Sequence, residues 1–225
     1  MSSAYHGRMF DCVHVSRDYF TVLYSGFNYC IRVILEIFRD CFLGLVCSTG
    51  YGMTVTLEQL IKIMPYSKDR AHKFIDHINA SLEEFDINTP QRIASFLAQI
   101  GHESGQLRYT KEIASGAAYE GRKDLGNTQK GDGVKFAGRG LVQITGRANY
   151  TACMLALDLD LLEHPELLET PENAARSAAW FWKDRGLNEI ADTGNQVKIC
   201  KVVNGGTNGL NDRLELFDMA RKVLA

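Results

Sequence analysis

The chain has 225 residues, 45% of them hydrophobic, and carries a formal net charge of -2 at pH 7. The apolar fraction is enough for a substantial core, and the nearly balanced charge argues against a nucleic-acid-binding protein. No uncharged apolar run is long enough to span a bilayer as a helix, so no membrane span is predicted.

The first 52 residues differ in character from the rest of the chain. They hold four of the six cysteines and many aromatic residues, without helical or strand periodicity. Their most apolar stretch, residues 30–47, is interrupted by four charged side chains, which makes it a poor signal peptide and a poor anchor. We predict that residues 1–52 are an extension outside the fold, that Met53 is the biological start, and that residues 53–225 form the folded domain. An export or anchoring segment is the alternative.

Helix signals begin directly after Met53. Thr56 and Gln59 have the spacing of a capping box, which predicts the start of a first helix. Ser67 is expected to cap a second helix. That helix would bury one stripe of apolar side chains between residues 71 and 85.

The next predicted helix ends on a glutamate. Thr89 is its N-cap, Pro90 occupies the first helical position, and apolar residues follow at helical intervals up to Ile100. Glu103 lies seven residues after Phe96 and therefore almost on the same stripe. Because a carboxyl group at the edge of an apolar face loses hydration, its pKa rises toward the range that a general acid needs. Glu103 is the predicted proton donor.

A second glutamate, Glu112, follows nine residues later. Fully extended, these nine residues would span roughly 30 Å, whereas two carboxyl groups that cleave a glycosidic bond with inversion lie about 6.5–9.5 Å apart. The chain must therefore fold back, and the Ser-Gly pair at 104–105 supplies the flexibility. The stretch 109–113 would return beside the cleft, with Tyr109 as a substrate contact and Glu112 as the general base.

Downstream, the elements become mixed. The Gly131-Asp-Gly133 sequence and the stretch 134–145 predict a small β-hairpin with loops. With helices on both sides of this segment, the sequence predicts a mainly helical α+β domain that has a cleft between two lobes.

Helices are predicted again in the last quarter of the chain. One opens at Thr170 and ends near Gly186; its Trp180 and Trp182 lie in an alanine-rich stripe, which favours core packing over stacking on a sugar ring. The last helix starts near Asn211. Its predicted buried residues are Leu214, Phe217 and Leu224.

Five separated segments, in this order, resemble the family 19 glycoside hydrolases, the chitinase-like group that includes many bacteriophage endolysins. They are residues 99–105 (QIGHESG), 112–122 (EIASGAAYEGR), 138–150 (GRGLVQITGRANY), 179–182 (AWFW) and 203–213 (VNGGTNGLNDR). The resemblance extends from about Met53 to Ala225. It implies a lysozyme-like two-lobed fold and an inverting mechanism on polymers of β-1,4-linked N-acetylated amino sugars.

The resemblance also implies roles for single residues. It makes Glu103 the acid and Glu112 the base, and it places at Thr145 the hydroxyl that helps to hold the attacking water. The short-loop members that this chain resembles place the second acid nine residues after the first. Longer plant-type members have a wider gap, which keeps Glu120 as the alternative second carboxylate.

Substrate contacts are implied at four further positions, which are Gln143, Asn149, Asn204 and Arg213. Amide groups at such positions match the hydroxyl and N-acetyl groups of a sugar chain. For Gln143 and Asn149 the alternative is that they only tie a loop to the core. Arg122 and Arg139 are expected to hold the carboxylates in place, with ordinary salt bridges as the alternative.

We therefore expect an endo-glycosidase that lyses cell walls by cutting peptidoglycan. A chitinase acting on chitin is the close alternative, and a catalytically inactive carbohydrate-binding protein is the more distant one. The polysaccharide is the expected partner of a monomeric protein, and no metal or other cofactor is predicted. Without a convincing signal peptide, the protein is expected to stay in the cytoplasm of the producing cell until lysis or release and then to act on the wall.

Overall fold

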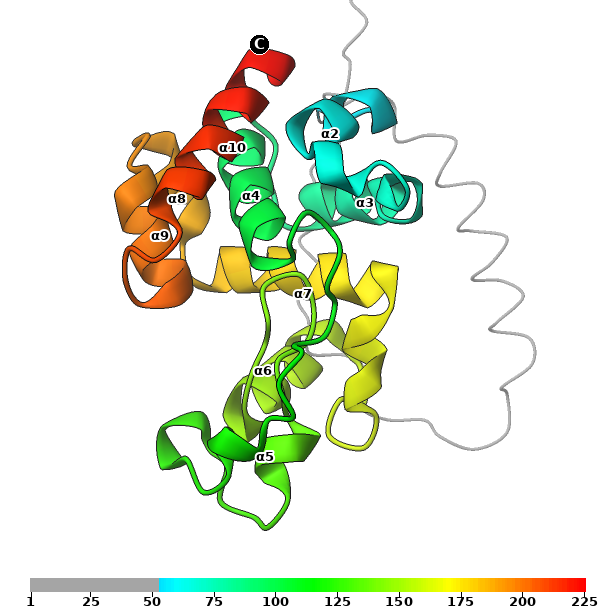
Figure 1. The fold of residues 1–225 in the computed structure, drawn as a ribbon, viewed down its shortest axis with the longest axis vertical. Coiled ribbons are helices and arrows are strands. Elements are labelled where there is room, and N and C mark those ends of the chain that lie inside the picture. Colours follow the sequence, from blue (N-terminus) through cyan, green and yellow to red (C-terminus); the bar gives the residue numbers. More distant parts are fainter. Residues whose placement is uncertain (1–52) are drawn as a thin grey trace, which may run out of the picture. The chain divides into compact units, whose positions relative to one another are not determined.

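The computed structural model describes residues 53–225, and the predicted extension, residues 1–52, lies outside the described residues. The described part is mainly helical, as predicted, and contains no β-strand (Figure 1). None of its helices has the length and apolar character that a membrane crossing requires. In chain order the α-helices are α2 (Leu57–Ile63), α3 (Ile75–Glu84), α4 (Pro90–Glu103), α5 (Asp132–Lys135), α6 (Arg147–Leu157), α7 (Pro171–Asp184), α8 (Leu187–Asp192), α9 (Gln196–Asn204) and α10 (Leu210–Leu224). The short 3₁₀ helices are η1 (Pro65–Ser67), η2 (Ala71–Lys73), η3 (Ala117–Tyr119), η4 (Lys123–Leu125) and η5 (Pro165–Glu169).

The two N-terminal helix starts differ in how well the sequence predicts them. The capping box at α2 is confirmed, because Thr56 and Gln59 exchange side-chain and backbone hydrogen bonds at 2.9 and 3.1 Å. The start at Ser67 is wrong. Its hydroxyl donates backwards to the Met64 carbonyl oxygen at 2.7 Å and so closes the preceding turn. The chain then forms η1 and η2, and α3 begins only at Ile75.

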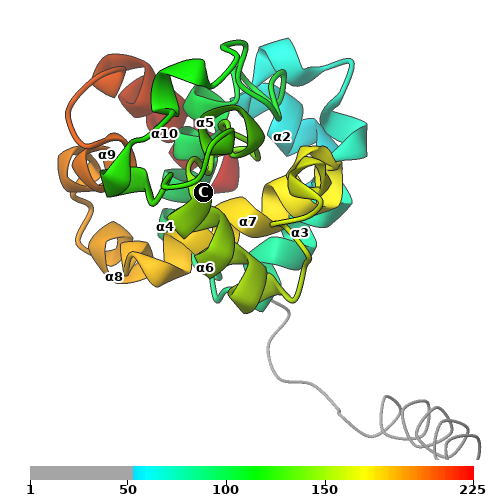
Figure 2. The same ribbon diagram turned by 90° about the horizontal axis from the view of Figure 1, so that it is seen from below.

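Helix α4 lies among the other helices, beside α10, in both views (Figures 1 and 2). Thr89 caps it as predicted, by accepting a hydrogen bond from the first turn at 3.2 Å. Residues 93–101 are all buried, and not only the predicted stripe, because α10, α8 and α7 pack around the helix. Phe96 meets Trp182 of α7 edge to face, with ring centroids 5.5 Å apart, so Trp182 belongs to the core. This burial fixes the position of the last helical residue, Glu103.

The buried apolar side chains form two groups. The first core joins α2, α3, α4, α7, α8, α9 and α10. The second core is smaller and surrounds α6. Its members are Phe136, Ile144, Tyr150, Cys153, Leu157, Leu161 and Leu168. Helix α7 contacts both, since its buried alanines face the first core while Trp180 packs against the second. The two cores agree with the two predicted lobes.

The predicted hairpin is reduced to single bridges. Residues 132–135 form the short helix α5, and across the turn that follows, a single residue pair, Arg139 and Ile144, forms a β-bridge. Arg139 and Ile144 exchange backbone hydrogen bonds of 3.1 and 2.7 Å, and Arg139 also bridges to Lys111. This small pairing brings the segment that contains Glu112 beside the segment that contains Gly138.

The buried face of α10 is rotated from the predicted one. Leu224 is buried as expected, but Leu214 and Phe217 are only partly buried. The helix turns Arg213, Leu216 and Ala220 inward instead. An arginine can occupy a core-facing position because its guanidinium finds polar partners at the end of α4.

A buried ion pair holds the α5 region to α6. Asp132, at the start of α5, accepts from the Arg147 guanidinium at 2.6 and 2.9 Å and from the Gln129 backbone N–H at 2.9 Å. The hydrogen bond with Arg147 lowers the pKa of the Asp132 carboxyl. A lowered pKa in the folded state means that the carboxylate stabilises the fold above its unfolded pKa, near 4, and that this contribution disappears as the pH falls through the folded value.

We therefore predict that Asp132→Asn lowers the free energy of unfolding by about 1.5–3 kcal/mol at pH 7. The difference from the wild type should shrink as the pH falls below about 4, because the carboxyl group of the unfolded wild type takes up a proton before that of the folded protein does. Urea unfolding at pH 7, 5 and 3 measures both values. A difference that stays constant over this range would contradict an electrostatic origin.

Candidate active site

Glu103 is the last residue of α4 and is followed by an unusual turn. Gly105, Gln106 and Leu107 all have left-handed backbone angles, with φ between 57° and 65°. Two of them are not glycines, so the turn is strained and must be held by its surroundings. The Ser104 hydroxyl accepts from the Leu107 N–H at 2.8 Å, and the Leu107 side chain is buried. The reversal that the sequence requires after Glu103 thus takes place within three residues.

The Glu103 carboxylate contacts a buried guanidinium. Arg213 of α10, only 2% exposed, donates through Nη2 to Glu103 Oε1 and through Nη1 to Gln99 Oε1, the latter at 2.5 Å. Gln99 lies one turn before Glu103 on α4, so the two acceptors share one helix face. The predicted apolar surroundings of Glu103 are wrong on this side, because the Arg213 guanidinium contacts the carboxylate. Among the described residues, Glu103 Oε2 has no hydrogen-bond partner.

A second contact joins the same two helices. His102 Nδ1 lies 2.6 Å from Asp212 Oδ2, in the first turn of α10. Gly209, the N-cap of α10, lies against the His102 ring so closely that a Cβ atom there would overlap it. Two contacts therefore hold the end of α4 to the start of α10. One joins His102 of α4 to Asp212 of α10, and the other joins Arg213 of α10 to Glu103 of α4.

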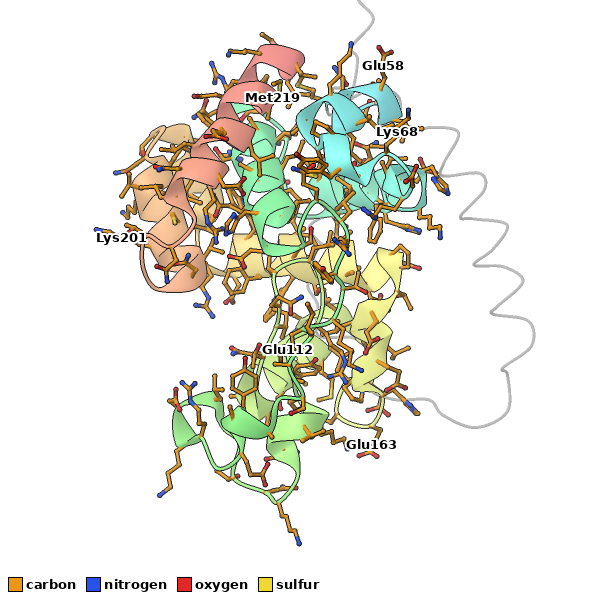
Figure 3. All side chains as sticks on the ribbon, viewed as in Figure 1. Glu58, Lys68, Glu112, Glu163, Lys201 and Met219 are labelled. Carbon is orange, nitrogen blue, oxygen red and sulfur yellow. The ribbon has the colours of Figure 1, made fainter. Side chains whose placement is uncertain are left out.

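Glu112 lies on the loop that joins α4 to α5 (Figure 3). Two hydrogen-bond donors hold its side chain. The Gly138 N–H donates to Glu112 Oε1 at 2.6 Å, and the Tyr119 hydroxyl donates to Oε2 at 2.9 Å. Burial raises the pKa of the Tyr119 hydroxyl, and the hydrogen bond to Glu112 raises it further, so Tyr119 stays protonated and remains a donor. Both contacts fix the orientation of the Glu112 side chain in the loop.

Three of the predicted residues converge on Gly138. A Cβ atom at Gly138 would lie 2.8 Å from Gln143 Oε1, 3.1 Å from Thr145 Oγ1 and 3.4 Å from Glu112 Cδ. The Thr145 hydroxyl donates to the Gln143 carbonyl oxygen at 2.9 Å, and Asn149 donates through Nδ2 to the Thr145 carbonyl oxygen at 2.8 Å. The structure thus brings Glu112, Gln143 and Thr145 together around one glycine.

Gln143 combines strain with an unused acceptor. Its φ of 59° is rare for a residue with a side chain. Its side-chain Nε2 donates to the Gly140 carbonyl oxygen at 3.0 Å, whereas the buried Oε1 has no partner among the described residues. A buried acceptor without a partner is costly, and such a cost together with backbone strain is typical of ligand-binding positions.

Glu120, the alternative second carboxylate, is bonded differently. Its two oxygens accept from the backbone N–H groups of Gly131 and Gly133 at 2.7 and 2.9 Å. These contacts tie the η3 loop to the start of α5. Glu120 thus joins two loops, and none of the predicted substrate residues forms a hydrogen bond with its side chain.

Two other predicted contacts have mainly local partners. Asn204 ends α9 and closes the following loop, because its amide donates to the Asn208 carbonyl oxygen and accepts from the Gly206 N–H, both at 2.8 Å. Tyr109 packs its ring near Gly105. The structure does not bring Asn204 into hydrogen-bond contact with the residues around Gly138.

The arginines expected to hold the carboxylates are bonded elsewhere. Arg122 pairs with Asp124, and Arg139 donates to Glu169 at 2.7 Å. Arg213 and Tyr119 contact Glu103 and Glu112 instead. The i, i+4 spacing of Gln99 and Glu103 puts both side chains on one helix face, where a single cation can contact both. No sequence pattern points to Tyr119.

Gly138→Ala tests the arrangement around this glycine. We predict that it lowers glycan hydrolysis by about 10²-fold, because the new methyl group displaces Gln143 and Thr145 and misplaced catalytic groups lose activity on this scale. Reducing-end release on a purified glycan measures the effect. Gly206→Ala is the matched control, since a Cβ there meets only Asn204 Oδ1, at 3.8 Å. Full activity in Gly138→Ala would show that this convergence does not serve hydrolysis.

Comparison with known proteins identifies the family of this chain. The family described as "Chitinase class I", glycoside hydrolase family 19, matches residues 76–192. The chain therefore belongs to glycoside hydrolase family 19 and is a glycoside hydrolase.

The relatives include bacterial and plant proteins. A glycosyl hydrolase family 19 domain-containing protein of Haemophilus influenzae is 28% identical over 198 residues, which are 73% of this chain and 96% of that protein. An endochitinase of Arabidopsis thaliana is 31% identical over 160 residues, 68% of this chain and 58% of that protein. The chain thus spans nearly all of the bacterial protein but only about half of the plant enzyme.

Solved structures show the same fold. Chitinase C from Streptomyces griseus superposes with a TM-score of 0.66 at 21% identity, covering 79% of this chain and 95% of that one. A class IV chitinase from Zea mays gives 0.51 at 19% identity, covering 86% and 93%. The lysozyme-like fold implied by the sequence is therefore confirmed.

Proposed function

We propose that the protein is an inverting endo-glycosidase that hydrolyses β-1,4-linked polymers of N-acetylated amino sugars, with Glu103 as acid and Glu112 as base. The observation that carries this proposal is the difference between the two carboxylates. Glu103 has one oxygen bonded to Arg213 and one without a partner among the described residues, whereas both oxygens of Glu112 accept a hydrogen bond. Two carboxyl groups in different environments are the equipment of an acid–base pair.

Glu103 would donate a proton to the leaving oxygen through Oε2. The Arg213 contact at Oε1 orients the carboxyl group. As the proton leaves, negative charge develops on Glu103, and the buried guanidinium stabilises it without reorganisation. The contact with Arg213 is therefore stronger after the proton has left Glu103 than before. An interaction speeds a reaction only if it strengthens toward the transition state, and this one does.

Glu112 would take a proton from the attacking water. Each of its oxygens has already accepted one hydrogen bond, and a carboxylate oxygen has a second lone-pair direction for a water. Thr145 Oγ1 lies next to the same glycine as Glu112 and is suited to hold that water, while Gln143 Oε1 is suited to accept from an N-acetyl N–H. Inversion requires the water and the acid on opposite faces of the sugar.

We propose peptidoglycan as the substrate and cell-wall lysis as the role. The resemblance of the five segments to a group that includes many bacteriophage endolysins supports this choice. Chitin is the second candidate, favoured by the relatives named as endochitinases and by the neighbouring chitinase structures.

Side-by-side digestion separates the two substrates. Purified peptidoglycan and chitin are incubated with the protein, and the new reducing ends are identified by mass spectrometry. Release from peptidoglycan is expected, and muramic-acid reducing ends would mark a muramidase. Release from chitin alone would overturn the peptidoglycan proposal while leaving the acid–base pair intact. The anomeric form of the first product, followed by NMR, tests inversion.

A further inference from the structure

Most arginines of the described part are neutralised by a carboxylate. Of the ten between residues 53 and 225, seven lie within 4.0 Å of an aspartate or glutamate oxygen. The remaining three are Arg70, Arg108 and Arg221. Arg221 donates to Gln91, far from Glu103 at the other end of α4. Arg70 and Arg108 both belong to the segments around the turn that follows Glu103.

Contacts with uncharged groups hold these two arginines in place. Arg70 donates through Nη1 to the Tyr66 carbonyl oxygen at 2.9 Å. The Tyr66 N–H in turn donates to Gln106 Oε1 at 2.8 Å, which fastens η1 to the strained turn. The Arg108 guanidinium lies over the Tyr109 ring, 5.1 Å from its centroid. Both side chains are thus oriented while their positive charge remains uncompensated, which is how arginines that recognise anions are prepared.

The surroundings add to the positive charge. Lys68 and Lys73 are exposed, and among the described residues neither has a carboxylate within ion-pair distance. Lys68 lies on the segment between α2 and α3 (Figure 3). Asp69 is the acidic side chain between them in sequence, so residues 68–73 remain net positive. Tyr66, 80% exposed, presents an aromatic ring in the same segment.

We propose that Arg70 and Arg108 bind carboxylate groups carried by the substrate, namely those of the peptide stems on peptidoglycan. The proposal rests on the function proposed above and deepens it. A chitin chain is neutral and offers these guanidiniums no anion, whereas a peptide stem places carboxylates beside the glycan near the cleaved bond. The arginine pair would then give the enzyme its preference between two polymers with similar backbones.

Chemically neutralised sacculi test the proposal. Sacculi are first freed of wall-linked phosphate polymers, and one half is then amidated with carbodiimide and ammonia so that the stem carboxylates lose their charge. The wild type is expected to cleave untreated sacculi with a KM about tenfold lower than amidated sacculi. Arg70→Gln/Arg108→Gln should raise the KM on untreated sacculi to the amidated value, without changing kcat or the hydrolysis of N-acetylglucosamine oligomers.

Lys201→Gln/Lys222→Gln is the matched control, because it removes two exposed charges from α9 and α10 that pair with no carboxylate in the described part. This variant should behave as the wild type on every substrate. If the arginine variant also behaves as the wild type on both kinds of sacculi, carboxylate binding by this pair is overturned and the proposed function survives. If the wild type cleaves only the neutral oligomers, carboxylate binding and peptidoglycan as the substrate both fail, while the acid–base pair stands. Cosedimentation of the inactive Glu103→Gln protein with the two kinds of sacculi gives the same comparison for binding alone.

Discussion

Glu103→Gln is expected to lower hydrolysis of the glycan by roughly 10²–10⁴-fold while leaving the fold unchanged. The glutamine amide has almost the shape of the carboxyl group, and its oxygen can still accept from Arg213, so the buried guanidinium keeps a partner. It cannot deliver a proton to the leaving oxygen. The loss should therefore appear in kcat, with glycan binding retained.

Reducing-end release, cosedimentation with insoluble glycan and urea unfolding measure the three quantities. Glu215→Gln is the control, because Glu215 is exposed on α10 and has no ion-pair partner in the described part. If Glu103→Gln keeps the wild-type kcat, the acid lies elsewhere. If instead its unfolding free energy falls by several kcal/mol, Glu103 serves mainly to neutralise Arg213, as the removal of one partner from a buried ion pair predicts.

Features that depend on neighbours in the chain could be predicted from the sequence. The capping box at Thr56 and the Thr89 cap with Pro90 follow from hydrogen bonds across three residues, and the structure forms both. Ser67 has the same residue type as a helix cap but bonds backwards, because a hydroxyl near a proline-initiated 3₁₀ turn has a second local acceptor. Local signals therefore name the possible partners of a side chain but do not choose between them.

Features that depend on distant contacts were not accessible in the same way. The buried face of α10 contains Arg213 and Leu216 in place of the predicted Leu214 and Phe217. Arg213 is stable at a buried position because two side chains of α4 accept hydrogen bonds from its guanidinium. The pKa argument for Glu103 considered only its own helix and therefore missed that guanidinium. Tyr119 is a comparable case, since its contact with Glu112 arises from a loop whose path no periodicity specifies.

The convergence around Gly138 lies between these extremes. The resemblance to the family selects Glu112, Gln143 and Thr145, but it gives no reason for a glycine at 138. In the structure that reason is steric, because a Cβ atom at 138 would lie too close to Gln143 Oε1 and Thr145 Oγ1, at 2.8 and 3.1 Å, with Glu112 Cδ next to them at 3.4 Å. The same geometry distinguishes Glu112 from Glu120, which the sequence alone does not. Glu112 lies beside Gly138 with Gln143 and Thr145, whereas Glu120 bonds to Gly131 and Gly133.

Glu112→Gln should accordingly lose activity but keep its stability, whereas Glu120→Gln should lose stability but keep most of its activity. Glu112→Gln is expected to lower kcat by roughly 10²–10⁴-fold, because an amide cannot accept a proton from water. Its stability should change little, since the amide oxygen can accept from Gly138 and the Tyr119 hydroxyl can turn to accept from the amide nitrogen. Glu120→Gln loses one of two backbone contacts and should cost about 1 kcal/mol of unfolding free energy, with activity reduced less than about tenfold.

A small nucleophile sharpens the distinction. In Glu112→Ala the base is missing, and azide, which needs no deprotonation, should restore turnover and give a glycosyl azide of inverted configuration. Glu120→Ala offers no such missing proton acceptor, so azide should leave its rate unchanged. Rescue of Glu120→Ala, together with an active Glu112→Gln, would exchange the two assignments and make the joining contact to Gly131 and Gly133 part of the catalytic apparatus.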